Sequence, residues 1–196
     1  MPGVDERSGD LSAEIWLVRH GETEWSRDGR HTSVTDLPLT PKGEEQASVL
    51  RDRLREASFA RVVSSPLARA VRTAELAGLE VDEVDVDLHE WRYGDYEGVS
   101  TPQLRETVPG WTVWSHPSPG GESGDEVATR CDRVIGRCRD RGGRTLLVAH
   151  GHLLRVLAAR WVAEPYGFGR HLYLDTGTIS VLGDDRGSPV LRRWNG

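Results

Sequence analysis

The amino-acid sequence predicts an α/β fold in three layers, in which a mostly parallel central sheet is flanked by helices. Short apolar runs of strand length alternate along the chain with longer segments whose apolar residues recur at helical spacing. At 196 residues the chain is also large enough to bury a full core without disulfides or metals. We therefore expect one domain over residues 14–196, preceded by a flexible tail over residues 1–13.

The strands are expected where apolar runs are short and continuous. They are predicted at residues 15–18, 61–64, 84–86, 145–149 and 178–182, with a further strand at 190–194.

Three helices are predicted from one start signal, a hydroxyl side chain at the N-cap followed by proline at the first helical position. The signal occurs at Thr40-Pro41, Ser65-Pro66 and Thr101-Pro102.

Two more helices are predicted in the second half of the chain. One opens at Ser123, where Glu126 completes a capping box, and its apolar positions fall at helical spacing as far as residue 138. The other follows Gly151. Between these groups, residues 108–121 form a long loop of the kind that often acts as a lid. Its Trp111 and Trp114 either cover an edge of the core or line the mouth of a substrate pocket.

Composition limits the classes of function. The net charge of −6 argues against a nucleic-acid or anionic-membrane surface. No apolar run approaches the roughly 20 residues that a bilayer crossing needs, and the polar, acidic N-terminus lacks the features of a secretory signal. Cys131 and Cys138 lie too far apart along a helix for a disulfide and are expected on its buried face. These observations favour a reducing, cytoplasmic location.

The segment that indicates chemistry is LVRHGET at residues 17–23, directly after an apolar run. A buried strand that ends on Arg19 and His20 brings a cation and an imidazole to one point, which suits an anionic substrate attacked by histidine. His150 ends the strand at 145–149 in the same way, and Gly151 leaves room for close approach. Phosphoryl transfer needs such positive charge, a nucleophile and a proton donor.

Three further segments strengthen this interpretation. They read SSPLARAVRTA at 64–74, LHEWRYGDYEG at 88–98 and LLVAHGH at 146–152. With residues 17–23 they resemble, in the same order, the signatures of the histidine phosphatase superfamily, which includes phosphoglycerate mutases and many acid phosphatases. The resemblance implies a phosphoglycerate mutase-like fold.

The resemblance also implies the roles of the reacting residues. It assigns His20 as the nucleophile that forms a phosphohistidine, Arg19 and Arg69 as clamps on the phosphoryl oxygens, His150 as a ligand of the transferred group, and Glu90 as the proton donor. Such a mechanism needs neither a metal nor another cofactor, although the spacing of His150 and His152 also occurs in metal sites.

The same resemblance suggests further substrate contacts. Phosphate contacts are expected from Ser26, where the family often has asparagine, and from Thr32 and Ser33, where Ser33 replaces a glycine. Gly151 and Trp91 are assigned to substrate binding.

The positions of three other charged residues suggest their roles. Arg155, one helical turn past His150, contacts either a second phosphate or sugar hydroxyl, or only solvent. Arg72 is expected in a surface salt bridge, and Glu22 as an anchor of the loop after the nucleophile.

The sequence favours a phosphatase over a mutase. Mutases of the family usually carry extra basic residues after the Glu90 region, whereas Arg105 is the only basic residue at 99–114. Details of the motifs are similar to sedoheptulose bisphosphatase-like enzymes and broad-specificity acid phosphatases. We therefore expect a phosphoric monoester hydrolase acting on a small sugar phosphate or similar ester. A cofactor-dependent phosphoglycerate mutase, a phosphoprotein phosphatase, a phosphate-binding regulatory module and a homodimer are left open.

Overall fold

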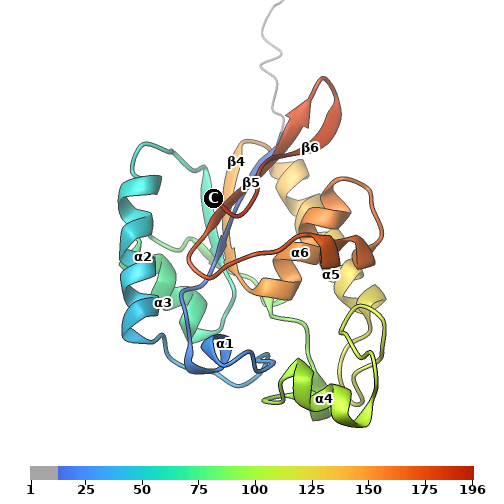
Figure 1. Cartoon of the computed structure of the whole chain (residues 1–196). Coiled ribbons are helices and arrows are strands. Elements are labelled where there is room, and N and C mark those ends of the chain that lie inside the picture. The colour runs from blue at the N-terminus through green and yellow to red at the C-terminus, as the bar shows by residue number, and fades with distance from the viewer. Residues whose placement is uncertain (1–12) are drawn as a thin grey trace, which may run out of the picture.

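The computed structural model describes residues 13–196 and has a six-stranded sheet between two layers of helices (Figure 1). The strands are β1 (Glu14–Arg19), β2 (Arg61–Ser64), β3 (Glu83–Val84), β4 (Arg144–Ala149), β5 (Ile179–Asp185) and β6 (Ser188–Arg193). They are arranged in the order β3-β2-β4-β1-β5-β6. Strands β1 to β4 are parallel to one another, while β5 runs antiparallel to both of its neighbours, β1 and β6. The predicted three-layer α/β fold is confirmed. Except for residue 13, the predicted tail lies outside the described residues.

Two pairs of helices enclose the sheet. Helices α2 (Pro41–Leu54) and α3 (Ala68–Leu76) cover one face, and α5 (Gly124–Arg141) and α6 (Gly151–Trp161) cover the other (Figure 1). Successive side chains of a strand point to opposite faces. Ile15 and Leu17 of β1 accordingly join the core under α5 and α6, while Val18 joins the core under α2 and α3. The sheet is therefore buried on both faces.

The parallel strands end at one edge of the sheet. In the register of the sheet, Arg19 of β1 lies beside Ala149 of β4, and Val148 lies beside Ser64 of β2. The next residues of the three strands are therefore delivered to the same place. The short helices α1 (Glu24–Arg27) and α4 (Thr101–Thr107) lie beyond this edge (Figure 1). Helix α1 was not predicted.

Two of the predicted helix starts are confirmed. Thr40 caps α2, with Pro41 at the first helical position, and its hydroxyl accepts from the Gly43 N–H. Ser123 caps α5 in a capping box with Glu126.

The other two predicted caps are wrong. Helix α4 is capped one residue earlier, by Ser100, because Gln103 lies three residues on and completes a capping box there. Helix α3 begins at Ala68 with Leu67 in the cap position and no side-chain cap. The Ser65 hydroxyl is instead engaged by His150.

The predicted strand at 84–86 is shorter than expected. Strand β3 ends at Val84, because the Asp85 carboxylate accepts from the Asp87 N–H and opens a 3₁₀ turn, η1 (Val86–Leu88). Two further 3₁₀ turns are η2 (Gly94–Tyr96) and η3 (Tyr166–His171).

The cysteines are buried on α5 without a disulfide, as predicted. Burial raises the pKa of the Cys131 thiol to about 12 and that of Cys138 to about 11, so both are protonated at neutral pH. Within residues 13–196, none of the helices has the length and apolar character needed to span a membrane.

Candidate active site

A cavity of about 430 Å³ lies at the edge where the parallel strands end. Seven of the predicted site residues line it: Arg19, His20, Ser26, Thr32, Glu90, Gly151 and Arg155. Two more, Arg69 and His150, are fully buried beside it. The centres of the His20 and His150 rings are 5.1 Å apart. The fold thus brings together residues from positions 19 to 155 of the chain.

Hydrogen bonding fixes the tautomer of His20. Its Nδ1 lies 2.7 Å from the carbonyl oxygen of Gly21, which can only accept, so Nδ1 carries the proton. Burial, followed by the charges of Arg69 and Arg19, holds the pKa of His20 well below its usual range. The ring is therefore neutral at neutral pH, and its Nε2 presents a lone pair.

The two arginines are held by backbone carbonyls. Nη1 of Arg19 donates to the carbonyl of Leu174. The guanidinium of Arg69 donates to the carbonyls of Ser33 at 3.1 Å and Thr35 at 3.0 Å. Among residues 13–196, Arg19 forms no salt bridge and Arg69 forms only a long one, to Asp36 at 3.8 Å. Both side chains therefore keep positive charge available for an anion.

Arg19, Arg69 and His150 share a further feature, a buried side-chain nitrogen without a hydrogen-bond partner among residues 13–196. Among residues 13–196, six buried side-chain nitrogen or oxygen atoms lack a hydrogen-bond partner, and three of them are Nε of Arg19, Nε of Arg69 and Nδ1 of His150. Leaving buried polar atoms unpaired costs about 1–3 kcal/mol each. A tetrahedral oxyanion could satisfy all three, so these residues are suited to bind a phosphoryl group.

Glu90 is tied to the start of helix α6. Its Oε1 accepts from the backbone N–H groups of Trp91 and Leu153, both at 2.8 Å, and its Oε2 accepts from that of His152 at 3.0 Å. Glu90 is only 5% exposed, yet it lines the cavity. Oε2 accepts a single backbone bond and is therefore the better placed oxygen for exchanging a proton with a substrate.

Ser33 does not contribute its side chain to the cavity, contrary to the predicted phosphate contact. Its hydroxyl and N–H are both taken by the carboxylate of Glu97, which also accepts from the Thr35 N–H at 3.0 Å. Glu97 thereby holds the two residues whose carbonyls accept from Arg69. Ser33 acts on the site through its backbone.

The cavity wall includes residues that the sequence analysis did not assign to the substrate. The Tyr93 hydroxyl lies 2.6 Å from Nδ1 of His152, and His31 packs on the Tyr93 ring at 4.7 Å. Burial is the main cause that lowers the pKa of His152 well below its usual range, lowers that of His31 to about 4, and raises that of Tyr93. Thr101 and Tyr173 also line the cavity. These five side chains form a neutral, polar part of a lining that also includes the cations Arg19, Arg30 and Arg155.

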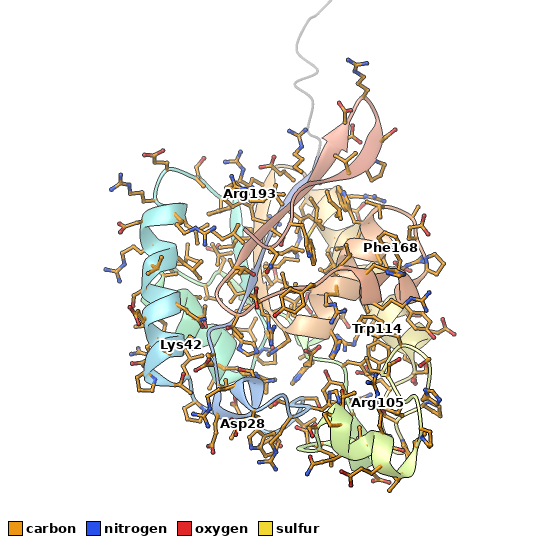
Figure 2. All side chains as sticks on the ribbon, viewed as in Figure 1. Asp28, Lys42, Arg105, Trp114, Phe168 and Arg193 are labelled. Atoms are coloured by element: carbon orange, nitrogen blue, oxygen red, sulfur yellow. The ribbon has the colours of Figure 1, made fainter. Side chains whose placement is uncertain are left out.

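Arg155 is held against Trp114 at the side of the cavity. Its guanidinium lies over the Trp114 ring at 4.8 Å, and Nε donates to the carbonyl of Gly169. Trp114, labelled in Figure 2, belongs to the segment between α4 and α5, and its ring packs against Arg155 of α6. Arg155 is therefore a fixed cation of the cavity wall and not only a surface residue.

The tryptophans do not line this cavity. Trp91, predicted as a substrate contact, is 2% exposed because its indole N–H donates to the carbonyl of Glu122 and its ring packs edge-on against Trp114. Trp111 is buried in the core against Tyr96, as the first of the two alternatives expected.

The two secondary assignments are confirmed by their contacts. Arg72 pairs with Glu44 and Glu75 at the surface. Glu22 accepts from the Thr40 hydroxyl at 2.9 Å and pairs with Lys42, so it anchors the loop after His20 to the start of α2.

The contacts of His150 and His152 bear on whether this pair could bind a metal ion. His150 directs Nε2 to the Ser65 hydroxyl, and His152 directs Nδ1 to Tyr93. Over the described part of the chain, no three His, Cys, Asp or Glu side chains form a group that could hold a metal ion.

Several known proteins are similar to this chain. Residues 15–196 match the profile of the histidine phosphatase superfamily (branch 1). The chain is 42% identical to an acid phosphatase of Mycobacterium tuberculosis, over 91% of this chain and 90% of the relative. It is 35% identical to sedoheptulose 1,7-bisphosphatase of Saccharomyces cerevisiae, over 77% and 68%. It is also 35% identical to a probable phosphoglycerate mutase of Salmonella choleraesuis, over 86% and 84%.

A solved structure shows the same fold. The product of an open reading frame of Mycobacterium tuberculosis superposes with a TM-score of 0.90 at 40% identity, covering 93% of this chain and 97% of that one.

Proposed function

Because the chain belongs to the histidine phosphatase superfamily, we propose that it is a phosphoric monoester hydrolase that cleaves small phosphomonoesters through a phosphohistidine on His20, without a metal. The observation that carries the proposal is the set of unpaired buried nitrogens on Arg19, Arg69 and His150 around a histidine whose free atom is Nε2. These are a nucleophile and three donors suited to a phosphoryl group.

In the first step, the Nε2 lone pair of His20 attacks phosphorus and the bond from phosphorus to the leaving oxygen breaks. Glu90 gives its proton to that oxygen, so the leaving group departs as an alcohol. The phosphorylated ring is positively charged, and the Gly21 carbonyl stabilises it through Nδ1–H. The unpaired nitrogens of the two arginines and His150 hold the phosphoryl oxygens.

In the second step, the Glu90 carboxylate takes a proton from water. The water oxygen attacks phosphorus, and the bond from Nε2 to phosphorus breaks. Phosphate leaves, His20 returns to its neutral tautomer, and Glu90 is again protonated. Atoms and protons balance over the two steps.

The structure supports hydrolysis over mutase activity. Within the segment at 99–114, only Thr101 lines the cavity. Arg105, the sole basic residue of that segment, donates instead to the carbonyl of Trp111. This segment therefore brings no cation to hold the carboxylate and second phosphate of a phosphoglycerate, and water can take the phosphoryl group.

The cavity favours a small, hydroxylated leaving group. Its volume lies in the range of sites for small molecules. The neutral hydroxyl and imidazole groups of Tyr93, His31 and His152 suit sugar hydroxyls, while Arg155 suits a second phosphate. A sugar phosphate or bisphosphate is the substrate class that we propose, in line with the bisphosphatase among the relatives.

The test is phosphate release from a panel of sugar monophosphates, sugar bisphosphates and p-nitrophenyl phosphate, with and without EDTA, by the wild-type protein and by His20→Ala. We expect release that EDTA does not change and that the variant loses by at least about 1000-fold. Phosphoglycerates with a bisphosphoglycerate primer complete the panel. Isomerisation with little free phosphate would make the protein a mutase, and turnover of phosphopeptides alone would make it a phosphoprotein phosphatase.

The role of Arg155 has its own test. Arg155→Ala should lower kcat/KM for bisphosphates by about tenfold more than for monophosphates, because a charge-assisted contact to the second phosphate is lost. Arg72→Ala, which removes a surface arginine paired with Glu44, is the control. Equal losses on both substrate classes would contradict the second-phosphate contact.

A further inference from the structure

A buried serine contacts the second histidine of the site. Ser65 follows β2 and His150 follows the neighbouring strand β4, and because Ser64 pairs with Val148 in the sheet, both residues leave it at the same edge. Oγ of Ser65 lies 2.7 Å from Nε2 of His150, and neither residue is exposed to solvent. Ser65 is not the helix cap that its sequence position suggests, which leaves its hydroxyl for this contact.

Counting donors and acceptors decides the direction of this hydrogen bond. The Ser65 oxygen already accepts from the Leu67 N–H at 3.4 Å. Within the described chain, its hydroxyl hydrogen has one acceptor in reach, Nε2 of His150. If His150 donated instead, the serine hydrogen and the Nδ1 lone pair would both be buried without partners. If Ser65 donates, only the Nδ1–H of His150 is left unpaired. This arrangement is favoured because it leaves one fewer buried polar group without a partner.

The ring of His150 is also neutral, which makes the choice of tautomer meaningful. Burial, followed by the charge of Arg69, holds the pKa of His150 well below its usual range. A neutral imidazole carries one proton, on Nδ1 or on Nε2.

We propose that Ser65 is a positioning residue that fixes His150 in its Nδ1–H tautomer and so turns the unpaired Nδ1 into a hydrogen-bond donor for the transferred phosphoryl group. The two histidines then have the same tautomer and opposite functions. In His20, Nδ1–H is held by the Gly21 carbonyl and the lone pair on Nε2 is free. In His150, the lone pair on Nε2 is held and Nδ1–H is free. The phosphoryl role of His150 rests on the proposed function, whereas its tautomer does not.

The tautomer can be measured without any turnover. Long-range ¹H–¹⁵N correlation spectra of histidine-labelled protein distinguish a protonated ring nitrogen from an unprotonated one, and the difference from a His150→Gln spectrum assigns the signals. We expect a protonated Nδ1 and an unprotonated Nε2 on His150 in the wild type. Ser65→Ala should mix the tautomers, and Ser65→Thr, which keeps the hydroxyl, should restore the wild-type pattern.

The kinetic readout connects the tautomer to phosphoryl transfer. Ser65→Ala should lower kcat by at least about tenfold with little change in KM, because a donor to the transferred group is weakened. The control is Ser180→Ala, which removes the hydroxyl of a buried serine on β5 that accepts from the Asn195 N–H. The control should retain both the kcat and the His150 spectrum.

Two results would overturn the proposal: an unprotonated Nδ1 on His150 in the wild type, or a Ser65→Ala variant that keeps both the spectrum and the kcat of the wild type. A protein with the expected tautomer that hydrolyses no phosphoester would leave the assignment of Ser65 standing and would place the failure with the proposed phosphatase activity.

Discussion

At the scale of the residue, the site depends on which atoms hold protons. His20 can act as a nucleophile only while it is neutral, and burial together with Arg69 and Arg19 keeps it so. In the proposed mechanism Glu90 has the opposite requirement, since it must carry a proton when the leaving oxygen departs. Its backbone contacts hold the carboxyl group in place and leave Oε2 with room for this exchange.

Replacement of Glu90 by glutamine should separate leaving groups by their acidity. Alkyl phosphates need a proton on the departing oxygen, so Glu90→Gln should lower their kcat by about 100- to 10,000-fold. p-Nitrophenyl phosphate releases a stable phenolate and should lose less. The measurement is kcat on both esters, and an equal loss on the two would argue against Glu90 as the acid.

Gly151 should not tolerate a side chain. A Cβ at this position would lie 3.3 Å from Cζ and Nε of Arg19, so alanine would press on the guanidinium that faces the substrate. Gly151→Ala should lower kcat/KM by about tenfold while the free energy of unfolding changes by less than about 1 kcal/mol, because alanine favours the helix. Activity assays and urea denaturation of the same preparation test both parts. Gly136→Ala is the control, since a Cβ on that helical glycine of α5 would meet open space.

At the scale of the element, the site residues that could be predicted from the sequence are those at the ends of strands. A parallel strand delivers the residue after its carboxyl end to a known edge, which is why Arg19, His20 and His150 could be placed from the sequence. The orientation of a side chain within a loop could not be placed in this way. Ser33 turns to Glu97 and Trp91 turns to Glu122, and both partners are distant in sequence.

Glu97 illustrates how a loop supports a residue of the site. Within the described chain its carboxylate accepts hydrogen bonds from three donors: the Ser33 N–H, the Ser33 hydroxyl and the Thr35 N–H. A glutamine would direct an amide NH₂ at some of these donors. Glu97→Gln should therefore lower the free energy of unfolding by about 1–3 kcal/mol and raise KM, because the carbonyls that orient Arg69 are released.

Urea denaturation and steady-state kinetics measure the two effects of Glu97→Gln. The matched control is Glu106→Gln on the exposed side of α4. A variant that loses stability and keeps the wild-type KM would break the link from Glu97 to Arg69.

At the scale of the whole molecule, the sequence predicted the layers and the order of chemistry-bearing segments, but not the complete cavity. His31, Tyr93 and Tyr173 come from loops that are remote in the chain and converge only after the sheet and helices have packed. None of them lies at a strand end or in a helical repeat, so no local pattern marks them. The short helix α1 was missed for a related reason, since its four residues are too few for periodicity.

The buried histidines should make stability fall with acidity. In the unfolded chain a histidine titrates near pH 6.5. In the folded chain, the pKa values of His20, His150 and His152 are well below this value and that of His31 is about 4. Below about pH 6.5 the unfolded state therefore binds more protons, so the stabilisation present above that pH is lost as the pH falls.

Each such histidine should contribute a slope of about 1.4 kcal/mol per pH unit in the free energy of unfolding. Urea denaturation between pH 7.5 and 5 measures the slope. His31→Gln should reduce this slope by about 1.4 kcal/mol per pH unit, whereas His171→Gln, at an exposed position, should leave it unchanged. A slope near zero for the wild type would contradict the burial of these rings.

The start of helix α6 holds two residues of the candidate active site, His150 and Glu90. Its N-cap residue is His150, and the backbone N–H groups of His152 and Leu153 in its first turn donate hydrogen bonds to the Glu90 carboxylate. The groups that, in the proposed mechanism, stabilise the phosphoryl oxygens and protonate the leaving oxygen are thus both held by this helix. Because Glu90 is hydrogen-bonded to the turn that His150 caps, helix α6 sets the separation of these two side chains. The loops around the cavity can then diverge to admit other leaving groups without disturbing the alignment of the acid with the phosphorus.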